Sequence, residues 1–299
     1  MAQVIVCCAQ KGGCAKTVTV HNLSTALSQM GKKILAVDFD AQASLTICFG
    51  IEPRTPSVNI AHLMDMQAQD LPTPTKEDFV LHCSGIDLIP SSSRLSAISE
   101  MLRHEIGCER FLSNILNTLR NDYDYIIVDT GPKLDNLSVN ALIAADQLLI
   151  PVNPQFLSTA GLQPLLEMIH KVRLRFNPKI QISGILLTMC EQRTNLCKII
   201  SSQIRDAYSG TVPILENSIP MNVKVGESVY YAQSVLDYAP TSKAACAYKR
   251  FAVELDQKLS LEQSTSAPAS HLQIVSWNGQ LCHIRRSHLA IINGRCVPY

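Results

Sequence analysis

The sequence lacks several features that would assign it to a special class of protein. Its 299 residues include no C-x-x-C pair, no long block of like charges and only 5% aromatic residues. No apolar run approaches the roughly 18 residues that a membrane-spanning helix needs. The apolar start, Met1 to Cys8, has no basic residue ahead of it, which argues against a secretory signal. With 46% hydrophobic residues, disorder over most of the chain is excluded.

The charges nearly cancel, because 26 basic and 25 acidic residues leave a net charge of +1. Composition alone therefore gives no sign of a nucleic-acid partner. The eleven cysteines have no paired spacing, which predicts reduced thiols in a cytoplasmic protein. Four of them stand among aliphatic residues, where we expect buried thiols that pack as small hydrophobic side chains: Cys7, Cys8, Cys48 and Cys246.

Short β-branched runs alternate with amphipathic segments, which predicts an α/β fold with a mostly parallel sheet and helices on both faces. The expected strands are Val4 to Cys8, Ile34 to Asp38, Ile86 to Ile89, Tyr125 to Asp129, Gln147 to Val152 and Ile182 to Thr188. Apolar residues at intervals of three and four predict helices over Val20 to Met30, Leu112 to Leu119 and Tyr248 to Leu259. A further helix is predicted from Leu196, Ile199, Ile200 and Ile204.

The composition changes after Glu262. Residues 264–270 are small, polar and contain a proline, which is typical of a linker. Beyond them, two short apolar runs flank Asn278-Gly279, a pair that favours a tight hairpin because both residues tolerate positive φ. We expect a main domain at 1–262, a linker at 263–270 and a small β-rich tail at 271–299. The tail residues Cys282, His283, His288 and Cys296 match no standard zinc spacing, so we interpret them as ordinary strand and loop residues.

Residues 11–17 read Lys-Gly-Gly-Cys-Ala-Lys-Thr, directly after one predicted strand and at the start of a helix. A strand, a glycine-rich turn and a helix start place backbone N–H groups and the positive end of the helix dipole around a phosphate. Lys16 would then reach the terminal phosphates, and the Thr17 hydroxyl would bind Mg²⁺. Ala9 and Ala15 replace two glycines of the general phosphate-loop pattern, so this stretch alone leaves open a simple glycine turn.

Two other strands end in carboxylates. Asp38 and Asp40 close a strand that we expect beside the first one, and Asp129 closes the apolar run 126–128 in the manner of a Walker B segment. Each acid alone is explained by a solvated strand end. Three such motifs at the edge where α/β sheets bind ligands together predict a nucleotide and magnesium site.

These motifs give the chain a specific resemblance to the ParA/Soj-type partition ATPases, which belong with MinD to the deviant Walker A group of P-loop NTPases. The resemblance runs from about residue 3 to about residue 260. It implies that the protein binds ATP and Mg²⁺ and hydrolyses ATP to ADP and phosphate. Further matching segments are Tyr123 to Asp129, Ala145 to Val152, Leu187 to Met189, Arg193 to Asn195, Ile219-Pro220 and Ser242 to Tyr248.

The resemblance also implies a role for each motif residue. Lys11 is the signature lysine, which crosses the interface of an ATP-bound homodimer to reach the partner's nucleotide. Asp40 orients the attacking water, and Asp129 is the Walker B acid. The implied catalytic residues are Lys11, Lys16 and Asp40; the nucleotide-binding residues are Lys11, Gly12, Gly13, Cys14, Ala15, Lys16 and Thr17; the metal-binding residues are Thr17, Asp129 and, through water, Asp38.

Two departures from the family pattern bear on activity. Ala15 replaces the usual glycine, which is tolerable at negative φ but unfavourable for phosphate contact if the loop needs positive φ. Residues 133–135 read Lys-Leu-Asp where the family more often has Ser-Leu-Gly. An inactive relative is therefore an alternative, although the retained lysines and acids favour activity.

The implied partner of the ATP dimer is DNA, bound without sequence specificity. The segment from Lys171 to Arg205 carries seven basic residues against Glu191 alone, a patch whose DNA binding would depend steeply on salt. A solvated helix face is the alternative interpretation. Arg193 matches a family arginine implicated in DNA contact, whereas Met221 stands where an arginine is usual. The candidate DNA-binding residues are Arg193, Lys198 and Lys224.

We therefore expect a cytoplasmic, nucleoid-associated ATPase that segregates a chromosome, plasmid or mobile element, released from DNA when a ParB-like centromere-binding protein stimulates hydrolysis. A membrane-cycling ATPase like MinD is a rival, but it would need a basic amphipathic helix at the C-terminus. The tail predicts turns and short strands instead, so we expect no membrane partner. A weakly hydrolysing, ATP-dependent scaffold is a second alternative.

Overall fold

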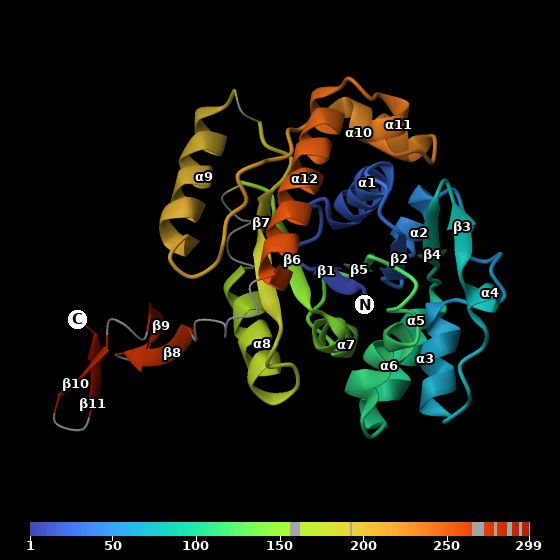
Figure 1. The fold of residues 1–299 in the computed structure, drawn as a ribbon, viewed down its shortest axis with the longest axis horizontal. Helices are drawn as coiled ribbons and strands as arrows, with labels where there is room; N and C mark the ends of the chain where they lie inside the picture. Colours follow the sequence, from blue (N-terminus) through green and yellow to red (C-terminus); the bar gives the residue numbers. More distant parts are fainter. Residues whose placement is uncertain are drawn as a thin grey trace.

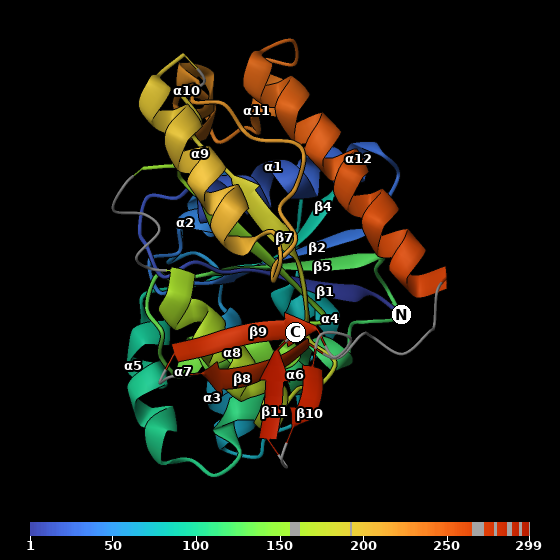
Figure 2. The same cartoon turned by 90° about the vertical axis from the view of Figure 1, so that its left-hand side faces the viewer.

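A computed structural model describes residues 1–155, 162–191 and 193–264, and places four further strands between residues 272 and 298. Its main body is a seven-stranded sheet between two layers of helices (Figures 1 and 2). The strands are β1 (Gln3–Cys7), β2 (Ile34–Phe39), β3 (Leu81–Cys83), β4 (Ile86–Ile89), β5 (Tyr125–Thr130), β6 (Gln147–Val152) and β7 (Gln181–Leu187). The helices are α1 (Lys16–Gln29), α2 (Ser44–Cys48), α3 (Ile60–Ala68), α4 (Lys76–Phe79), α5 (Arg94–Met101), α6 (Phe111–Asn117), α7 (Asn136–Ala144), α8 (Leu162–Arg175), α9 (Asn195–Tyr208), α10 (Val223–Tyr230), α11 (Val235–Tyr238) and α12 (Lys243–Ser264).

The strand order is β3-β4-β2-β5-β1-β6-β7, and every neighbouring pair except β3 and β4 is parallel. The predicted α/β fold class is confirmed. One expectation was wrong: β2 does not lie beside β1, because β5 is inserted between them. This order places Cys7, Asp38 and Asp129 at the same level on three adjacent strands, since Asp129 is the register partner of both other residues.

Both faces of the sheet are buried, because alternate residues of each strand point to opposite layers. On β1, Val4 and Val6 join the core beneath α3, α5, α6, α7 and α8, whereas Ile5 and Cys7 join the core beneath α1, α11 and α12. Figure 2 shows α12 lying across α1 on the second face. The central strands can therefore be continuously apolar, and their carboxyl ends converge at one edge.

Local differences from the sequence expectations have simple causes. The edge strand β3 has only three residues and was not predicted. In α9 the inward stripe is Cys197, Ile200 and Ile204, while Leu196 and Ile199 are 59% and 55% exposed, contrary to their predicted place in the helix core. Cys7, Cys8 and Cys48 are buried as expected, but Cys246 is only partly buried.

The C-terminal strands β8 (Leu272–Trp277) and β9 (Gln280–Arg285) pair antiparallel, as do β10 (Leu289–Ile292) and β11 (Arg295–Pro298). Neither pair joins the seven-stranded sheet. The predicted linker at 263–270 begins inside α12, which ends at Ser264, and its remaining residues lie outside the described part of the chain. The tail residues considered as zinc ligands also lie outside the described side chains.

Candidate nucleotide site

The turn between β1 and α1 has the backbone shape of an anion-binding loop. Gly13 and Ala15 adopt left-handed conformations with φ of 73° and 62°, and the Ala15 carbonyl accepts from Thr19 N at 2.9 Å to begin α1. A left-handed turn that leads into a helix start presents backbone donors to an anion. Glycine suits the first position, whereas at Ala15 the methyl group carries the steric cost of the left-handed region. Of the two backbone conformations that the sequence left open for Ala15, the structure has the one with positive φ.

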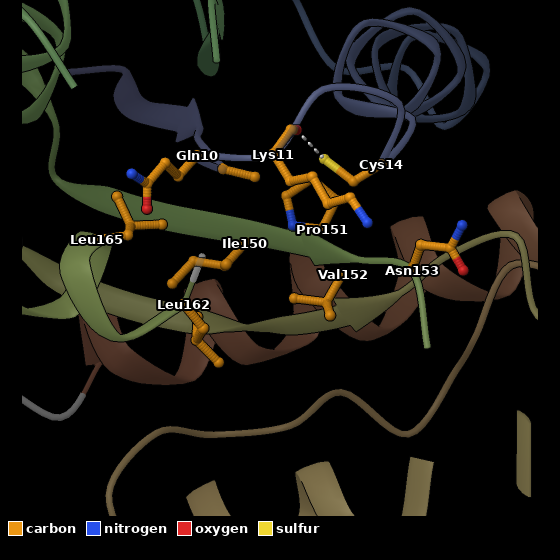
Figure 3. A pocket seen from close by; sticks show the side chains of 10 residues that line it. Gln10, Lys11, Cys14, Ile150, Pro151, Val152, Asn153, Leu162 and Leu165 are labelled. Atoms are coloured by element: carbon orange, nitrogen blue, oxygen red, sulfur yellow. Dashed lines mark hydrogen bonds between the residues drawn. The ribbon is translucent and has the colours of Figure 1, made fainter. Parts of the chain in front are cut away.

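The side chain of Lys16, at the position expected for the phosphate-loop lysine, folds back onto this turn. Lys16 is 8% exposed, and its ammonium donates to the Lys11 carbonyl at 3.3 Å. The Cys14 thiol donates to the same carbonyl at 3.2 Å, as Figure 3 shows. Below, the Thr188 hydroxyl at the end of β7 donates to the Cys14 carbonyl at 3.0 Å. The loop is therefore anchored to the sheet at Thr188, a contact that the sequence did not predict.

Lys11 lies over the carboxyl end of β6. It lines a shallow pocket together with Ala9, Gln10 and Cys14 from the loop, and Figure 3 shows Pro151 and Val152 beside it. The rest of the lining is mostly apolar and comes from β6, the residue after it and α8: Ile150, Asn153, Leu162 and Leu165. Lys11, for which the resemblance implies the role of signature lysine, thus stands at the edge of the loop, and Gly12 and Gly13 after it are exposed.

Asp129 is fully buried at the end of β5, beside the loop. Burial, together with the nearby Asp38, raises the pKa of the Asp129 carboxyl well above its usual range, and the neighbouring Thr17 hydroxyl and Lys16 ammonium offset this only in part. Within the described residues neither carboxylate oxygen has a hydrogen bond of normal geometry. A buried polar group without a partner is costly, so these oxygens are suited to a ligand.

The groups around Asp129 fit a magnesium ion in the presence of a phosphate. Mg²⁺ prefers oxygen ligands and usually keeps one or two protein ligands, with phosphate and water supplying the others. The Asp129 carboxylate and the Thr17 hydroxyl are such a pair. In the described part of the chain no three His, Cys, Asp or Glu side chains gather into a metal cage, which agrees with an ion held mainly by its nucleotide.

Asp38, also fully buried, holds the next loop in place. Its Oδ2 accepts from both the backbone N and the hydroxyl of Thr46 at 2.7 Å, and its Oδ1 accepts from Asp40 N at 3.3 Å. Burial raises the pKa of Asp38 to about 6, although these hydrogen bonds oppose the shift. The Thr46 hydroxyl in turn accepts from Ser91 N, and the Ser91 hydroxyl donates to the Asp40 carbonyl. Asp38 therefore positions Asp40. This structural role is additional to the place near the metal that the sequence predicted for Asp38.

Asp40 itself is partly exposed and faces the start of the loop after β5. Its Oδ1 accepts from Gln42 N at 3.1 Å. A Cβ at Gly131 would stand 3.2 Å from that same oxygen, closer than most real Cβ contacts, so glycine leaves room for Asp40 beside Asp129. Just beyond, Asp135 stands where the family more often has glycine. Its side chain caps α7 by accepting from Ser138 N at 3.2 Å, which gives the aspartate at this position a structural reason.

Comparison with known proteins decides the family. The family model described as "AAA domain" matches residues 2–182. The chain is 32% identical to the sporulation initiation inhibitor protein Soj of Bacillus subtilis over 257 residues, which are 85% of this chain and 98% of Soj. It is 30% identical to the chromosome-partitioning ATPase Soj of Thermus thermophilus, over 82% of this chain and 92% of that protein. The chain belongs to the Soj/ParA family of P-loop ATPases.

Solved structures show the same fold. Cobyrinic acid a,c-diamide synthase from Mycobacterium smegmatis, solved with an ATP analogue and magnesium, superposes with a TM-score of 0.75 at 27% identity, over 89% of this chain and 98% of that one. The cell division ATPase MinD of Pyrococcus furiosus shares the fold, with a TM-score of 0.68 at 23% identity over 86% of this chain and 99% of that one.

In this Soj/ParA-family chain, the sequence-predicted DNA residues lie in the turn before α9, on α9 and on α10. Arg193 is exposed in the turn between β7 and α9, and Lys198 is exposed on α9. Backbone hydrogen bonds from Cys190 N to the Ile219 carbonyl and from Met221 N to the Cys190 carbonyl join this turn to the segment before α10. Lys224 on α10 is exposed but pairs with Glu227 at 2.7 Å, so its charge is largely compensated.

Proposed function

We propose that this protein is a DNA-segregation ATPase whose ATP-bound homodimer binds DNA without sequence specificity and is released by hydrolysis. The observation that carries the proposal is the buried Asp129 carboxylate beside Lys16 and Thr17, at the mouth of an anion-binding loop, with no hydrogen bond of normal geometry among the described residues. Its relatives include chromosome-partitioning proteins of Thermus thermophilus and Caulobacter vibrioides.

ATP and Mg²⁺ are the ligands of this site. The backbone of residues 12–17 and the Lys16 ammonium would hold the phosphates, while Thr17 and Asp129 would hold the metal. When bound, the metal neutralises charge on the phosphates during phosphoryl transfer. Asp40, kept in place by Asp38 and by the space at Gly131, would accept a hydrogen bond from the attacking water and so orient it.

Lys11 would complete the site of a second protomer. It lies at the edge of the loop, over β6, with the exposed Gly12 and Gly13 next to it in sequence. Because phosphoryl transfer depends on positioning and charge neutralisation, a lysine that arrives only on dimerisation couples hydrolysis to assembly. ATP would then hold two protomers together, and hydrolysis would separate them.

DNA contact would come from the turn that carries Arg193 and from Lys198 on α9. Basic side chains that neutralise phosphates release counterions, so binding would fall steeply with salt. A ParB-like centromere-binding protein is the expected stimulator of hydrolysis, and the ATP dimer would associate with the nucleoid.

A membrane-cycling ATPase is the rival function. No helix in the described part of the chain has the length and apolarity needed to span a bilayer. The two functions are separated by incubating the protein with DNA and with anionic lipid vesicles, each with ATP, with ADP and without nucleotide. Our proposal predicts ATP-dependent, salt-sensitive retention on DNA and no flotation with vesicles. ATP-dependent flotation without DNA retention would support the rival.

A further inference from the structure

A second cavity lies beside residues 21–29 of α1, between this helix, the residue that follows α2, the turn before β4 and the corner between α10 and α11. Its volume is about 330 Å³. Its lining is His21, Thr25, Ser28, Gln29, Phe49, Ser84, Ile86, Ala232, Gln233, Ser234 and Asp237. None of these residues belongs to the nucleotide site.

The floor of this cavity holds an unsatisfied imidazole. His21 is 3% exposed, and within the described residues its Nδ1 has no hydrogen-bond partner. Burial lowers the pKa of His21 to about 4, so the ring is neutral near pH 7 and offers one acceptor nitrogen. The Phe49 ring packs edge-on against it, with 4.6 Å between ring centroids. The floor of the cavity is therefore uncharged near pH 7 and is formed by the packed rings of His21 and Phe49.

The rim of the cavity carries negative charge. Asp237 is the one carboxylate in the lining, which contains neither lysine nor arginine. Its Oδ1 accepts from Gln29 at 3.0 Å and its Oδ2 from the Ser234 hydroxyl at 2.6 Å, and each carboxylate oxygen has room for another donor. This charge disfavours a phosphate or nucleotide and favours a cation.

Exposed tyrosines continue the surface beyond the rim. Tyr230 is 84% exposed and Tyr231 is 58% exposed, and the Tyr231 ring stacks on Tyr238 with 5.5 Å between centroids. These residues directly precede Ala232 and follow Asp237 in the chain. Large exposed aromatic side chains beside a pocket are typical of surfaces that bind another protein chain.

We propose that this cavity is a docking pocket for an arginine side chain presented by a partner protein. A guanidinium carries five N–H donors and no acceptor, which matches the Asp237 carboxylate on the rim, and its plane packs well on aromatic rings. The tyrosines would contact the residues that flank the arginine. Binding at this pocket does not require nucleotide, so its test is independent of the proposed function.

The test uses isothermal titration of the full chain without nucleotide. The probes are a capped Leu-Arg-Leu peptide, the same peptide with citrulline, which keeps the shape but lacks the charge, and free L-arginine. We expect saturable binding of the arginine peptide, no binding of the citrulline peptide and weaker binding of free arginine. Equal binding of the two peptides, or no saturable binding of the arginine peptide, overturns the proposal. Equal affinity for free arginine and the peptide overturns the assignment to a protein partner.

Surface variants keep the test clear of folding effects, because truncating the buried His21 would open the core. Asp237→Asn should weaken the arginine peptide about tenfold, whereas Asp206→Asn, an exposed acid on α9 that also accepts from a serine hydroxyl, should have no effect. Tyr230→Ser should weaken the peptide and leave free arginine unchanged. An Asp237→Asn protein that binds the peptide as tightly as the wild type contradicts the pocket.

Discussion

At the scale of single residues, Ala15 is the clearest case of strain at the nucleotide site. Its φ of 62° lies in the left-handed region, where a Cβ costs roughly 1–2 kcal/mol. The family pattern has glycine here, and the structure gives the physical reason. With alanine at this position, the left-handed turn is formed at the expense of a less favourable backbone conformation.

Replacing Ala15 by glycine should therefore stabilise the protein. We expect Ala15→Gly to raise the free energy of unfolding by up to about 1 kcal/mol, because the relief of strain exceeds the added flexibility of the unfolded chain. Thermal unfolding measures this. Ala97→Gly, on the exposed face of α5, is the matched control and should lower stability by about 1 kcal/mol. A destabilised Ala15→Gly protein would argue against strain at this position.

Asp129 links stability to pH in the ligand-free protein. Burial raises the pKa of Asp129 and of Asp38, the latter to about 6, above the value near 4 of an unfolded aspartate. Between these values the folded state holds a proton that the unfolded state has lost. The contribution of these two groups to the free energy of unfolding is therefore greatest below about pH 4. It falls as the pH rises through their pKa values in the folded state.

The substitution Asp129→Asn should remove part of the stability loss that the wild type shows as the pH rises. Without nucleotide and with a chelator present, we expect the variant to be roughly 1–3 kcal/mol more stable than the wild type near pH 7, with a smaller difference at pH 4. It should also lose the additional stability that ATP with Mg²⁺ gives the wild type. Denaturant unfolding at both pH values measures the effect, with the exposed Asp206→Asn as control. A variant less stable than the wild type at pH 7 would contradict an unpartnered carboxylate.

At the scale of secondary-structure elements, the buried strands were the most predictable part. The runs at Ile34, Tyr125 and Gln147 are long, apolar and β-branched because both sheet faces are covered. β3 was missed because it has three residues and pairs only with β4; its His82 is exposed and pairs with Asp87. Short polar edge strands depend on contacts that the local sequence does not show.

Helix α9 shows why spacing alone cannot orient an element. Its apolar residues form two overlapping sets at intervals of three and four, and the packed set includes Cys197 instead of Leu196 and Ile199. The site was predictable where a motif is contiguous, as in residues 11–17. The network that joins Asp38 to Thr46 and Ser91 was not, because its members are far apart in sequence and carry no motif.

The turn between β7 and α9 is the element whose charge should matter most for DNA. We expect Arg193→Ala to weaken DNA binding severalfold. It should also reduce the slope of the logarithm of the binding constant against the logarithm of the salt concentration, by about the contribution of one phosphate contact. Lys224→Ala should have a smaller effect, since its ammonium already pairs with Glu227. Fluorescence anisotropy with duplex DNA and ATP across a salt series measures both. Lys249→Ala is the control, because Lys249 is exposed on α12. If Arg193→Ala weakens DNA binding no more than Lys249→Ala does, the turn between β7 and α9 is excluded as a DNA contact.

At the scale of the whole molecule, the sheet brings three loops to one edge, and we propose that a second copy of the chain completes the nucleotide site there. Lys16, Thr17 and Asp129 converge on one place, and Asp38 holds Asp40 beside them. Lys11 lies at the edge of the loop. The near-neutral net charge of +1 is compatible with DNA binding, because seven of the 26 basic residues lie in the segment from Lys171 to Arg205, which has Glu191 as its single acidic residue.

The most direct test of the account is the assembly state of Asp40→Ala with ATP and Mg²⁺, measured by sedimentation. If Asp40 orients the water, the variant binds ATP without hydrolysing it and sediments as a stable dimer of 32.9 kDa protomers, whereas Lys16→Ala binds no ATP and stays monomeric. An Asp40→Ala protein that binds ATP and remains a monomer would contradict the central claim that ATP holds two copies of this chain together.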